Sequence, residues 1–486
     1  MTRRKITTAQ RSPEPPIRPQ ELELVPDEHP GSHSNDIHSD TGEDLLQPNQ
    51  HNSLSDSDSD SKPSLKVTHL IHANLLIPGR GPPTLDSNVV IQDGKIIFVG
   101  PSRSLPDEYR NLLPTYVPVL MPGMWDCHTH LIGATSFNFD SVVTLHPATA
   151  GARLARSCAD ILDSGFTSVR ELGGWALEIA PAIEEGTIPG PHIYSAGAAL
   201  SQTAGHGDVF NFPLAWTWGA SRGDGVSPLC LADGVSEVRK AVRLQIRRGA
   251  QVIKVLASGG VLSIADDPLL QQFSDEELTV IVDEAGRMGR IVAAHVHGKA
   301  GILAAIRAGC RTLEHGTYLD EECVEKMKER DVMLVATRTI VKEGVKHPEL
   351  MSKESYVKML ETAKHHLQAY KLAIKSGVKI ALGTDLGSSI PGQALSLGKS
   401  GAELSYAVEA GMTALEAIEA ATANGPLTLG GMAPKSGQIK EGFDADLIAV
   451  ARNPLLDVKI LAEAKNITHV WKSGKLCKAP RREVFE

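Results

Sequence analysis

Two His-x-His pairs stand out among the residues that could do chemistry. His128 and His130 follow one apolar run, and His295 and His297 follow another. Side chains two positions apart on a strand face the same side, so both imidazoles of a pair could bind one metal ion. One such pair alone is a weak signal, because two unrelated surface or core histidines are the more common case.

A lysine in an apolar run adds a second signal. Lys254 lies within QVIKVLASGG, where a buried ammonium is costly unless it is paired. Its amine could snorkel to solvent or pair with a carboxylate. Alternatively, the amine could lose its proton and react with CO₂, giving a carbamate able to bridge two cations. His315 and Asp385 end two further runs. Six side chains of metal-binding type therefore lie in or at the end of such runs: His128, His130, Lys254, His295, His315 and Asp385.

These residues follow short β-rich runs that alternate with helical segments. The runs are Leu120–Trp125, Thr167–Arg170, His192–Ser195, Val252–Ala257, Ile291–His295, Thr312–His315, Val332–Ala336 and Lys379–Thr384. This alternation predicts an α/β fold, a (β/α)₈ TIM barrel, in which the C-terminal ends of the strands form the active-site face. A doubly wound open sheet is the alternative, but no Gly-rich phosphate-binding fingerprint follows any run.

The chain ends differ from this pattern. Residues 1–64 are acidic and Pro-rich, which predicts disorder. Residues 65–120 and 431–480 contain β-branched runs with Asp-Gly and Ser-Gly turns, so we expect them to build one smaller β-sandwich domain beside a barrel at 121–430. Residues 481–486 form a short tail.

Composition limits the partners. The formal net charge is −9 and aromatic residues make up 4% of the chain, which argues against a nucleic-acid surface. No apolar run is long enough for a membrane span, and the basic N-terminus lacks the apolar stretch of a signal peptide. The six cysteines are scattered, as expected of free buried thiols. We therefore predict a cytoplasmic protein without nucleic-acid or membrane partners.

Several longer stretches resemble a known family. WDCHTH, TSVREL, TAGHGD, AAHVHGKAGI, LEHGTY, IALGTD and EGFDADLIAV are similar to stretches of the amidohydrolase superfamily, in its binuclear-metal branch. The resemblance covers residues from about Leu65 to Pro480. It implies two Zn²⁺ ions per subunit, bridged by carboxylated Lys254 and a hydroxide. The ligands it implies are His128, His130 and Asp385 for the buried ion and His295 and His315 for the exposed one.

Within that superfamily the chain is similar to imidazolonepropionase-like enzymes, to Xaa-Pro and Xaa-Arg dipeptidases and, above all, to fungal ochratoxinases. This implies an amide hydrolase of carboxypeptidase type that converts ochratoxin A to ochratoxin alpha and phenylalanine, or cleaves related N-acyl amino acids. It also implies a homo-octamer, and secretion is possible for such relatives. The alternatives are a dipeptidase, a cyclic-amide hydrolase or a non-catalytic scaffold; retention of all six ligands disfavours the scaffold.

The same resemblance suggests roles around the metals. Asp385 would accept the proton of the water and deliver it to the leaving nitrogen. His297 would bind the substrate carbonyl or carboxylate, or else support a metal ligand. His206, in a Gly-rich loop, could also reach the substrate or could be an ordinary loop residue. A substrate carboxylate needs a cationic partner, for which the candidates are Arg170, Arg222 and Arg338.

Overall fold

A computed structural model describes residues 68–138, 140–225 and 227–480. The predictions of disorder over 1–64 and of a tail at 481–486 lie outside the described residues. None of the helices described is both long and apolar enough to cross a membrane.

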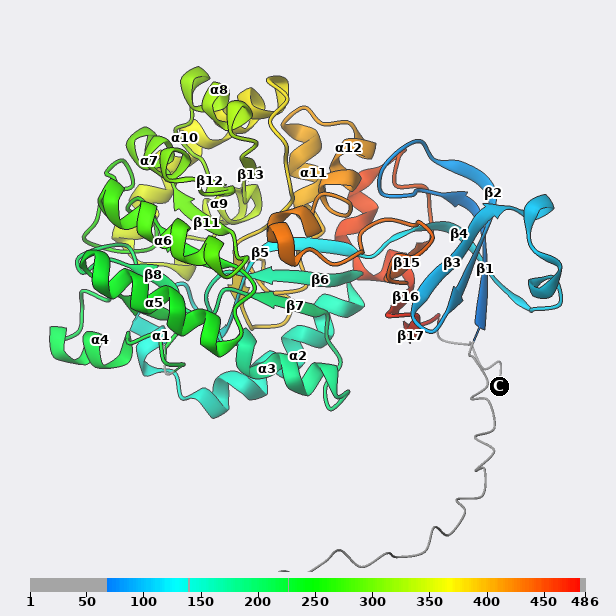
Figure 1. The fold of residues 1–486 in the computed structure, drawn as a ribbon, viewed down its shortest axis with the longest axis horizontal. Helices are drawn as coiled ribbons and strands as arrows, with labels where there is room; N and C mark the ends of the chain where they lie inside the picture. Colours follow the sequence, from blue (N-terminus) through cyan, green and yellow to red (C-terminus); the bar gives the residue numbers. More distant parts are fainter. Residues whose placement is uncertain (1–67, 139, 226, 481–486) are drawn as a thin grey trace, which may run out of the picture. The chain divides into compact units, whose positions relative to one another are not determined.

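The smaller part of the molecule is one seven-stranded sheet built from both ends of the described chain (Figure 1). Its order is β17-β16-β15-β4-β1-β2-β3, with β4 parallel to β1 and antiparallel to β15. Its strands are β1 (Thr68–Leu76), β2 (Thr84–Gln92), β3 (Lys95–Pro101), β4 (Pro114–Pro122), β15 (Leu447–Val450), β16 (Ile467–Lys472) and β17 (Lys475–Lys478). Because β4 and β15 join the two sets of strands edge to edge, the predicted β-sandwich is corrected to a single mixed sheet.

The larger part contains two sheets in which every strand pair is parallel. One sheet runs β14-β5-β6-β7 and the other runs β13-β12-β11-β10-β8-β9. The first comprises β5 (Met124–Ala134), β6 (Phe166–Glu171), β7 (His192–Ser195) and β14 (Leu386–Ser388). The second comprises β8 (Ala199–Ser201), β9 (Leu229–Leu231), β10 (Ile253–Leu256), β11 (Val292–Val296), β12 (Thr312–His315) and β13 (Met333–Val335).

The eighth predicted run, Lys379–Thr384, is not a regular strand but links these two sheets. The amide of Leu334 in β13 donates to the carbonyl of Lys379 at 3.0 Å, and the amide of Ala381 donates to the carbonyl of Leu334 at 3.1 Å. On the other side, the amide of Cys127 in β5 donates to the carbonyl of Leu382 at 2.8 Å. The run therefore occupies the predicted place between strands seven and one, but it is too irregular to form a continuous ladder.

Helices cover the outside of these sheets (Figure 1). They are α1 (Asp140–Thr144), α2 (Pro147–Asp163), α3 (Ala176–Glu184), α4 (Leu214–Ala220), α5 (Gly234–Arg248), α6 (Asp275–Arg287), α7 (Lys299–Ala308), α8 (Glu321–Glu329), α9 (Arg338–Gly344), α10 (Lys353–Lys375), α11 (Ala402–Glu409) and α12 (Ala414–Ala420). Short 3₁₀ turns lie at Ser102–Ser104, Asp107–Tyr109, Pro348–Leu350, Pro426–Met432, Val458–Ala462 and Ala464–Asn466.

Local sequence explains where the helices start and stop. A capping box opens α6: the Ser274 side chain accepts from the amide of Glu277, whose carboxylate accepts from the amide of Ser274. At the other end, α5 and α7 stop at Gly249 and Gly309, with φ of 109° and 99°, a left-handed conformation that costs glycine least. Each helix thus returns the chain to the start of the next buried strand.

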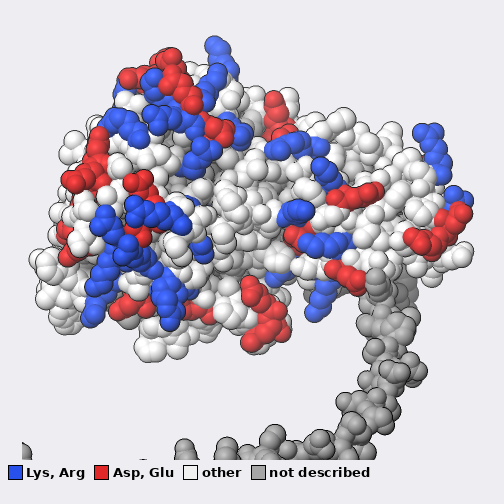
Figure 2. All heavy atoms as spheres, viewed as in Figure 1, with Lys and Arg blue, Asp and Glu red and all other residues white. Residues whose placement is uncertain are grey.

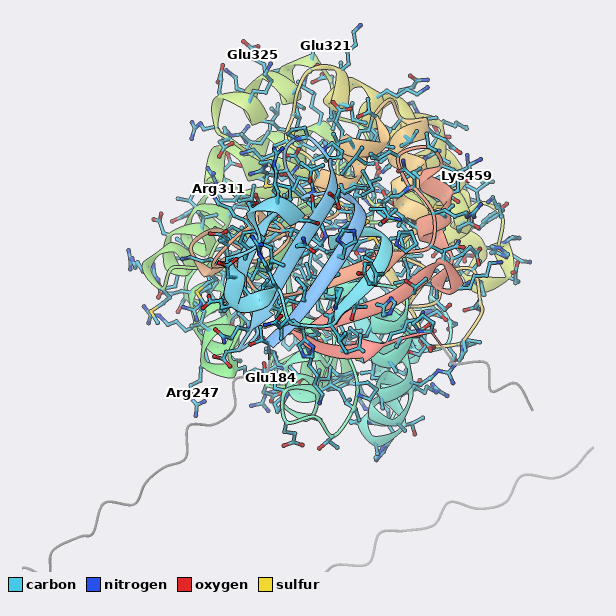
Figure 3. All side chains as sticks on the ribbon, turned by 90° about the vertical axis from the view of Figure 1, so that its right-hand side faces the viewer. Glu184, Arg247, Arg311, Glu321, Glu325 and Lys459 are labelled. Atoms are coloured by element: carbon cyan, nitrogen blue, oxygen red, sulfur yellow. The ribbon has the colours of Figure 1, made fainter. Side chains whose placement is uncertain are left out.

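Charged side chains remain on the outer helices. Arg239, Arg243 and Arg287 gather around Glu284 between α5 and α6, and Figure 2 shows basic and acidic side chains interspersed over this face. In Figure 3, Arg247 of α5 and Glu321 of α8 point outward at the rim, away from the seven-stranded sheet. The interior holds mostly apolar side chains, and its buried polar groups include His295, His315 and Glu171, which lie at or next to the C-terminal ends of parallel strands.

Candidate metal centre

A pocket of about 1100 Å³, its open mouth included, lies at the C-terminal ends of the parallel strands. All six predicted metal ligands line it, together with His206 and His297. The rest of its wall is mostly apolar and includes Phe137, Val142, Leu256, Val261, Ile340 and Met359. The fold therefore brings together residues up to 257 positions apart in sequence, from His128 to Asp385.

The first group of ligand atoms comes from β5 and from the residue before β14. His128 Nε2 lies 3.4 Å and His130 Nε2 3.0 Å from Asp385 Oδ1. The other ring nitrogens are anchored: His128 Nδ1 lies 2.9 Å from Glu314 Oε2, and His130 Nδ1 lies 2.8 Å from the Gly173 carbonyl. Because both anchors only accept hydrogen bonds, each Nδ1 carries a proton and each neutral ring turns a lone pair toward Asp385.

A lone pair that faces a carboxylate is repelled by it, and a proton on the ring would remove that repulsion. This can happen on His130 but not on His128. Burial opposes charge on His130, yet Asp385 raises its pKa above the ordinary value. For His128, burial and the nearby Lys254 lower the pKa to about 4. A cation between the two Nε2 atoms and the carboxylate would satisfy all three acceptors at once.

The second group of ligand atoms, from His295 and His315, is a stronger argument for a bound cation. Thr337 Oγ1 donates to the Ala336 carbonyl at 2.7 Å, so it must accept from His315 Nδ1, also at 2.7 Å. His295 Nε2 donates to the Gly259 carbonyl at 3.3 Å. Consequently His295 Nδ1 and His315 Nε2, which are 2.9 Å apart, face each other with two lone pairs. Burial, with the neighbouring histidines and Lys254, lowers the pKa of both rings well below the ordinary value, so a proton is a poor bridge and a divalent cation fits.

Lys254 lies between the two groups. Its Nζ is 3.4 Å from His128 Nε2, and its side chain is 2% exposed. Burial lowers the pKa of the Lys254 ammonium to about 8, although Glu314 and Asp385 oppose the shift. A neutral amine is the form that attacks CO₂, so the position suits the predicted carbamate.

Asp385 is held ionised. Burial would raise its pKa, but His128, His130 and Lys254 outweigh burial and lower it to about 2. The buried Asp126 carboxylate fixes the residue before it, accepting from Thr384 Oγ1 at 2.6 Å and from the Thr384 amide at 3.0 Å. The carboxylate of Asp385 is thereby aimed at the histidines.

Unusual backbone conformations aim several of these groups. His315, Thr337 and Asp385 have φ of 70°, 54° and 61°, in the left-handed region that non-glycine residues seldom occupy. Such a residue at the end of a strand turns the chain sharply and redirects the side chain into the pocket. Strain of this kind gathers at functional sites, because the surrounding contacts must compensate for it.

The arginines do not take the predicted places. Arg170 is fully buried beneath the histidines, where its guanidinium donates to Glu314 at 2.8 and 2.9 Å and to the Cys127 carbonyl at 2.6 Å. Because Arg170 projects from β6 toward the interior of the sheet, it has no route to substrate. Arg170 is therefore not a partner for the substrate carboxylate, and it pairs instead with the buried carboxylate of Glu314.

Arg338 and Arg222 also lie outside the pocket lining. Arg338 begins α9, and its guanidinium contacts His366 Nδ1 of α10 at 3.4 Å, behind the pocket wall. Arg222 is exposed and lies 3.8 Å from Asp224. Among the described residues no arginine lines the pocket, so the prediction that Arg338 binds the substrate carboxylate is corrected as well.

The two remaining histidines do face the pocket. His297 Nδ1 contacts Thr317 Oγ1 at 2.7 Å, while its buried Nε2 has no hydrogen-bond partner within the described part of the chain. His206 stacks on His295 with ring centroids 4.4 Å apart, and its Nδ1 lies 2.8 Å from Ser263 Oγ. Both are placed to contact a bound molecule.

Several groups that hold the site were missed from the sequence. Glu314, Thr337, Asp126 and the Gly173 carbonyl each fix a ligand or its neighbour. Glu314 carried a usable signal, because a glutamate inside an apolar strand is as costly as a lysine there. The Gly173 carbonyl carried none, since any residue supplies a carbonyl and only the fold places it.

Comparison with known proteins agrees with this geometry. The sequence profile of the Amidohydrolase family matches residues 119–477. The chain is 54% identical over 429 residues to ochratoxinase of Aspergillus niger, covering 85% of this chain and 87% of that protein. The crystal structure of A. niger ochratoxinase superposes with a TM-score of 0.80 at 52% identity, covering 86% and 96% of the two chains. A Xaa-Pro dipeptidase crystal structure with methionine bound in its active site gives a TM-score of 0.74 at 29% identity, covering 85% and 100%.

Proposed function

The chain belongs to the amidohydrolase family and is a hydrolase of amide bonds with a TIM-barrel-like domain, and on this premise we propose that it is a binuclear zinc-dependent enzyme of carboxypeptidase type. The observation that carries the proposal is the 2.9 Å contact between His295 Nδ1 and His315 Nε2, two acceptor atoms whose rings have committed their protons elsewhere. Only a cation makes that contact favourable.

We assign six residues to the metals. His128, His130 and Asp385 would hold one Zn²⁺ and His295 and His315 the other, with carboxylated Lys254 shared between them. When bound, such a pair of cations acidifies a shared water and polarises the carbonyl of the scissile amide. In the described part of the chain, the groups with three or more converging ligand atoms are His128, His130, Asp385 and His295, His297, His315.

Asp385 moves the proton in this proposal. One carboxylate oxygen of Asp385 faces His128 and His130, and its low pKa keeps the carboxylate ionised, the form that has a free site for a proton. It takes the proton from the water and passes it to the amide nitrogen, which must be protonated before it can leave.

The pocket supports an apolar amide as the substrate. Apart from Asp385, no carboxylate of the described chain lines the pocket, and Phe137, Val142, Ile340 and Met359 form much of its wall. The similarity to ochratoxinase and this apolar wall together favour ochratoxin A, whose amide joins an aromatic acyl group to phenylalanine. Cleavage would give ochratoxin alpha and phenylalanine, and related N-acyl amino acids are expected to react as well.

His297 and His206 take over substrate binding from the arginines. His297 Nε2 is the buried polar atom in need of a partner, so we assign it to the substrate carbonyl or carboxylate. The alternative is that His297 joins His295 and His315 as a further ligand, since its ring stacks on His315 with centroids 4.9 Å apart. His206, whose ring stacks on His295 and lines the pocket, is assigned to the substrate as well.

Release of phenylalanine from ochratoxin A by the purified, zinc-loaded protein is the direct test. N-acyl-phenylalanine and Xaa-Pro dipeptides are run in parallel, and the Asp385→Asn variant is the matched control. We expect turnover of ochratoxin A that disappears in the control. Strong cleavage of dipeptides with none of ochratoxin A would establish the second candidate, a dipeptidase, which the structural likeness to the Xaa-Pro dipeptidase favours.

A protein that neither retains nor regains zinc and stays inert would instead be the non-catalytic scaffold. Homo-octamer assembly and a cytoplasmic or secreted location stay predictions of the sequence.

A further inference from the structure

Five of the six pocket histidines, namely His128, His130, His295, His297 and His315, belong to the two groups of converging ligand atoms, and they are anchored by unlike groups. Four of the five anchors are neutral: the carbonyls of Gly173 and Gly259 and the hydroxyls of Thr317 and Thr337. The fifth is the carboxylate of Glu314, which accepts from His128 Nδ1 at 2.9 Å. Among these five rings, only His128 therefore has an anionic anchor; the sixth pocket histidine, His206, lies outside the two metal positions and has Asp266 at 3.8 Å from its Nδ1.

Glu314 is itself rigidly held. Its side chain is fully buried, both of its carboxylate oxygens accept from Arg170 Nη2, and Oε1 also accepts from Thr312 Oγ1 at 2.6 Å. These donors leave it no freedom to rotate away from His128. A fixed carboxylate behind an imidazole fixes the ring and makes its opposite nitrogen a better donor to a metal.

The two groups of ligands also differ in charge. The position between His128 and His130 includes the carboxylate of Asp385, whereas His295 and His315 contact no carboxylate within the described chain. In a buried site of low dielectric, that difference in charge weighs heavily on a divalent cation. The two cation positions are therefore not equivalent.

We propose that Glu314 is a positioning residue acting through His128, and that it makes the His128–His130–Asp385 position the tighter of the two, so that it fills first. This inference rests on the proposed function, because it presumes that two cations bind. It concerns the order and affinity of binding, which the proposed function leaves open.

Stepwise zinc binding tests the inference without measuring activity. The full-length protein is stripped of metal and titrated with Zn²⁺ against a chromophoric chelator, with bicarbonate present. The wild type should bind two ions with constants that differ by about tenfold or more, and Glu314→Gln should weaken the tighter one by roughly 10- to 100-fold while leaving the weaker one unchanged. Glutamine keeps the shape of Glu314 and an acceptor oxygen, so it removes chiefly the charge.

Two variants of Thr337 test the cation position at His295 and His315. Thr337→Ala removes the anchor of His315 and should weaken only the second ion, whereas Thr337→Ser keeps the hydroxyl and should bind as the wild type does. Crystals grown with one equivalent of zinc should show anomalous density beside His128 and His130. That experiment needs no variant, so it decides the order even if Glu314→Gln does not fold.

The outcomes separate the two levels of the argument. Two equal constants in the wild type, anomalous density beside His315, or a folded Glu314→Gln variant with an unchanged first constant would each overturn the role of Glu314 while leaving two bound ions. A wild type that binds no zinc would overturn the proposed function and this inference with it.

Discussion

The two His-x-His pairs have the same spacing but different surroundings. In the first, His128 and His130 lie with ring centroids 5.3 Å apart and both turn Nε2 toward Asp385. In the second, His295 and His297 lie 4.8 Å apart at an interplanar angle of 80°; His295 faces His315, and His297 leaves its Nε2 buried without a partner in the described chain. Identical motifs thus serve different purposes, because the third group that meets each pair comes from another strand.

The site has two halves, one around His128 and His130 and the other around His295 and His315. Lys254 lies between them, so its loss should have the largest effect. Lys254→Ala should lower turnover below detection and abolish binding of both zinc ions, since no anionic bridge remains. Activity and zinc content are measured with and without short carboxylic acids such as propionate. Partial rescue by the acid would support the carbamate, and an alanine variant with full zinc and full activity would exclude it.

Asp385 belongs only to the first half. Asp385→Asn should keep the fold and reduce kcat by roughly a thousandfold, because an amide cannot relay a proton. Circular dichroism checks the fold and steady-state kinetics give kcat and KM separately. An unchanged kcat would disprove the proton transfer.

His297 belongs only to the second half, and a variant at this position distinguishes substrate binding from metal ligation. His297→Gln should retain both zinc ions and lower kcat/KM by about a hundredfold, the size expected for one lost donor to the reacting carbonyl. Zinc content is the deciding measurement. Loss of one ion per subunit would make His297 a metal ligand and the two halves more alike than the geometry indicates.

The pH dependence of metal loading reports on Lys254. Its pKa of about 8 leaves about 10% of the amine neutral at pH 7, against roughly 0.03% for an ordinary lysine. As pH rises toward 8 more neutral amine forms, so zinc uptake by stripped protein at a constant concentration of dissolved CO₂ should accelerate, by nearly tenfold for each unit below that pKa. Lys254→Ala rescued by propionate lacks the amine and should show no dependence on bicarbonate; uptake that ignores bicarbonate in the wild type would contradict the carbamate.

The smallest effect on activity is expected for Arg338, which lies behind the pocket wall. Arg338→Met should leave KM essentially unchanged, because the guanidinium contacts His366 and does not line the pocket. Steady-state kinetics with two substrates that differ only in a free or amidated carboxylate provide the measurement. A selective rise in KM for the free acid would restore Arg338 as the carboxylate partner.

Much of the site could be read from the sequence because ligand type and strand position are local properties. Each of the six predicted metal ligands ends or lies in a recognisable apolar run, and the fold brings all six to one pocket. The substrate residues could not be read in the same way. Arg170 and Arg338 looked available because both follow or end a run, but the direction of a long side chain depends on neighbours such as Glu314 and His366 that are distant in sequence.

The sequence by itself determined the chemistry: imidazoles, a carboxylate and a lysine at the ends of alternating strands, which suit two cations. Only the tertiary structure decided which nitrogen of each ring faces the pocket, because a carbonyl, a hydroxyl or a carboxylate from another strand takes up the proton on the opposite nitrogen. It also decided that the terminal strands join in one sheet and that Arg170 supports the site from beneath, since pairing and burial arise from contacts that no local pattern encodes.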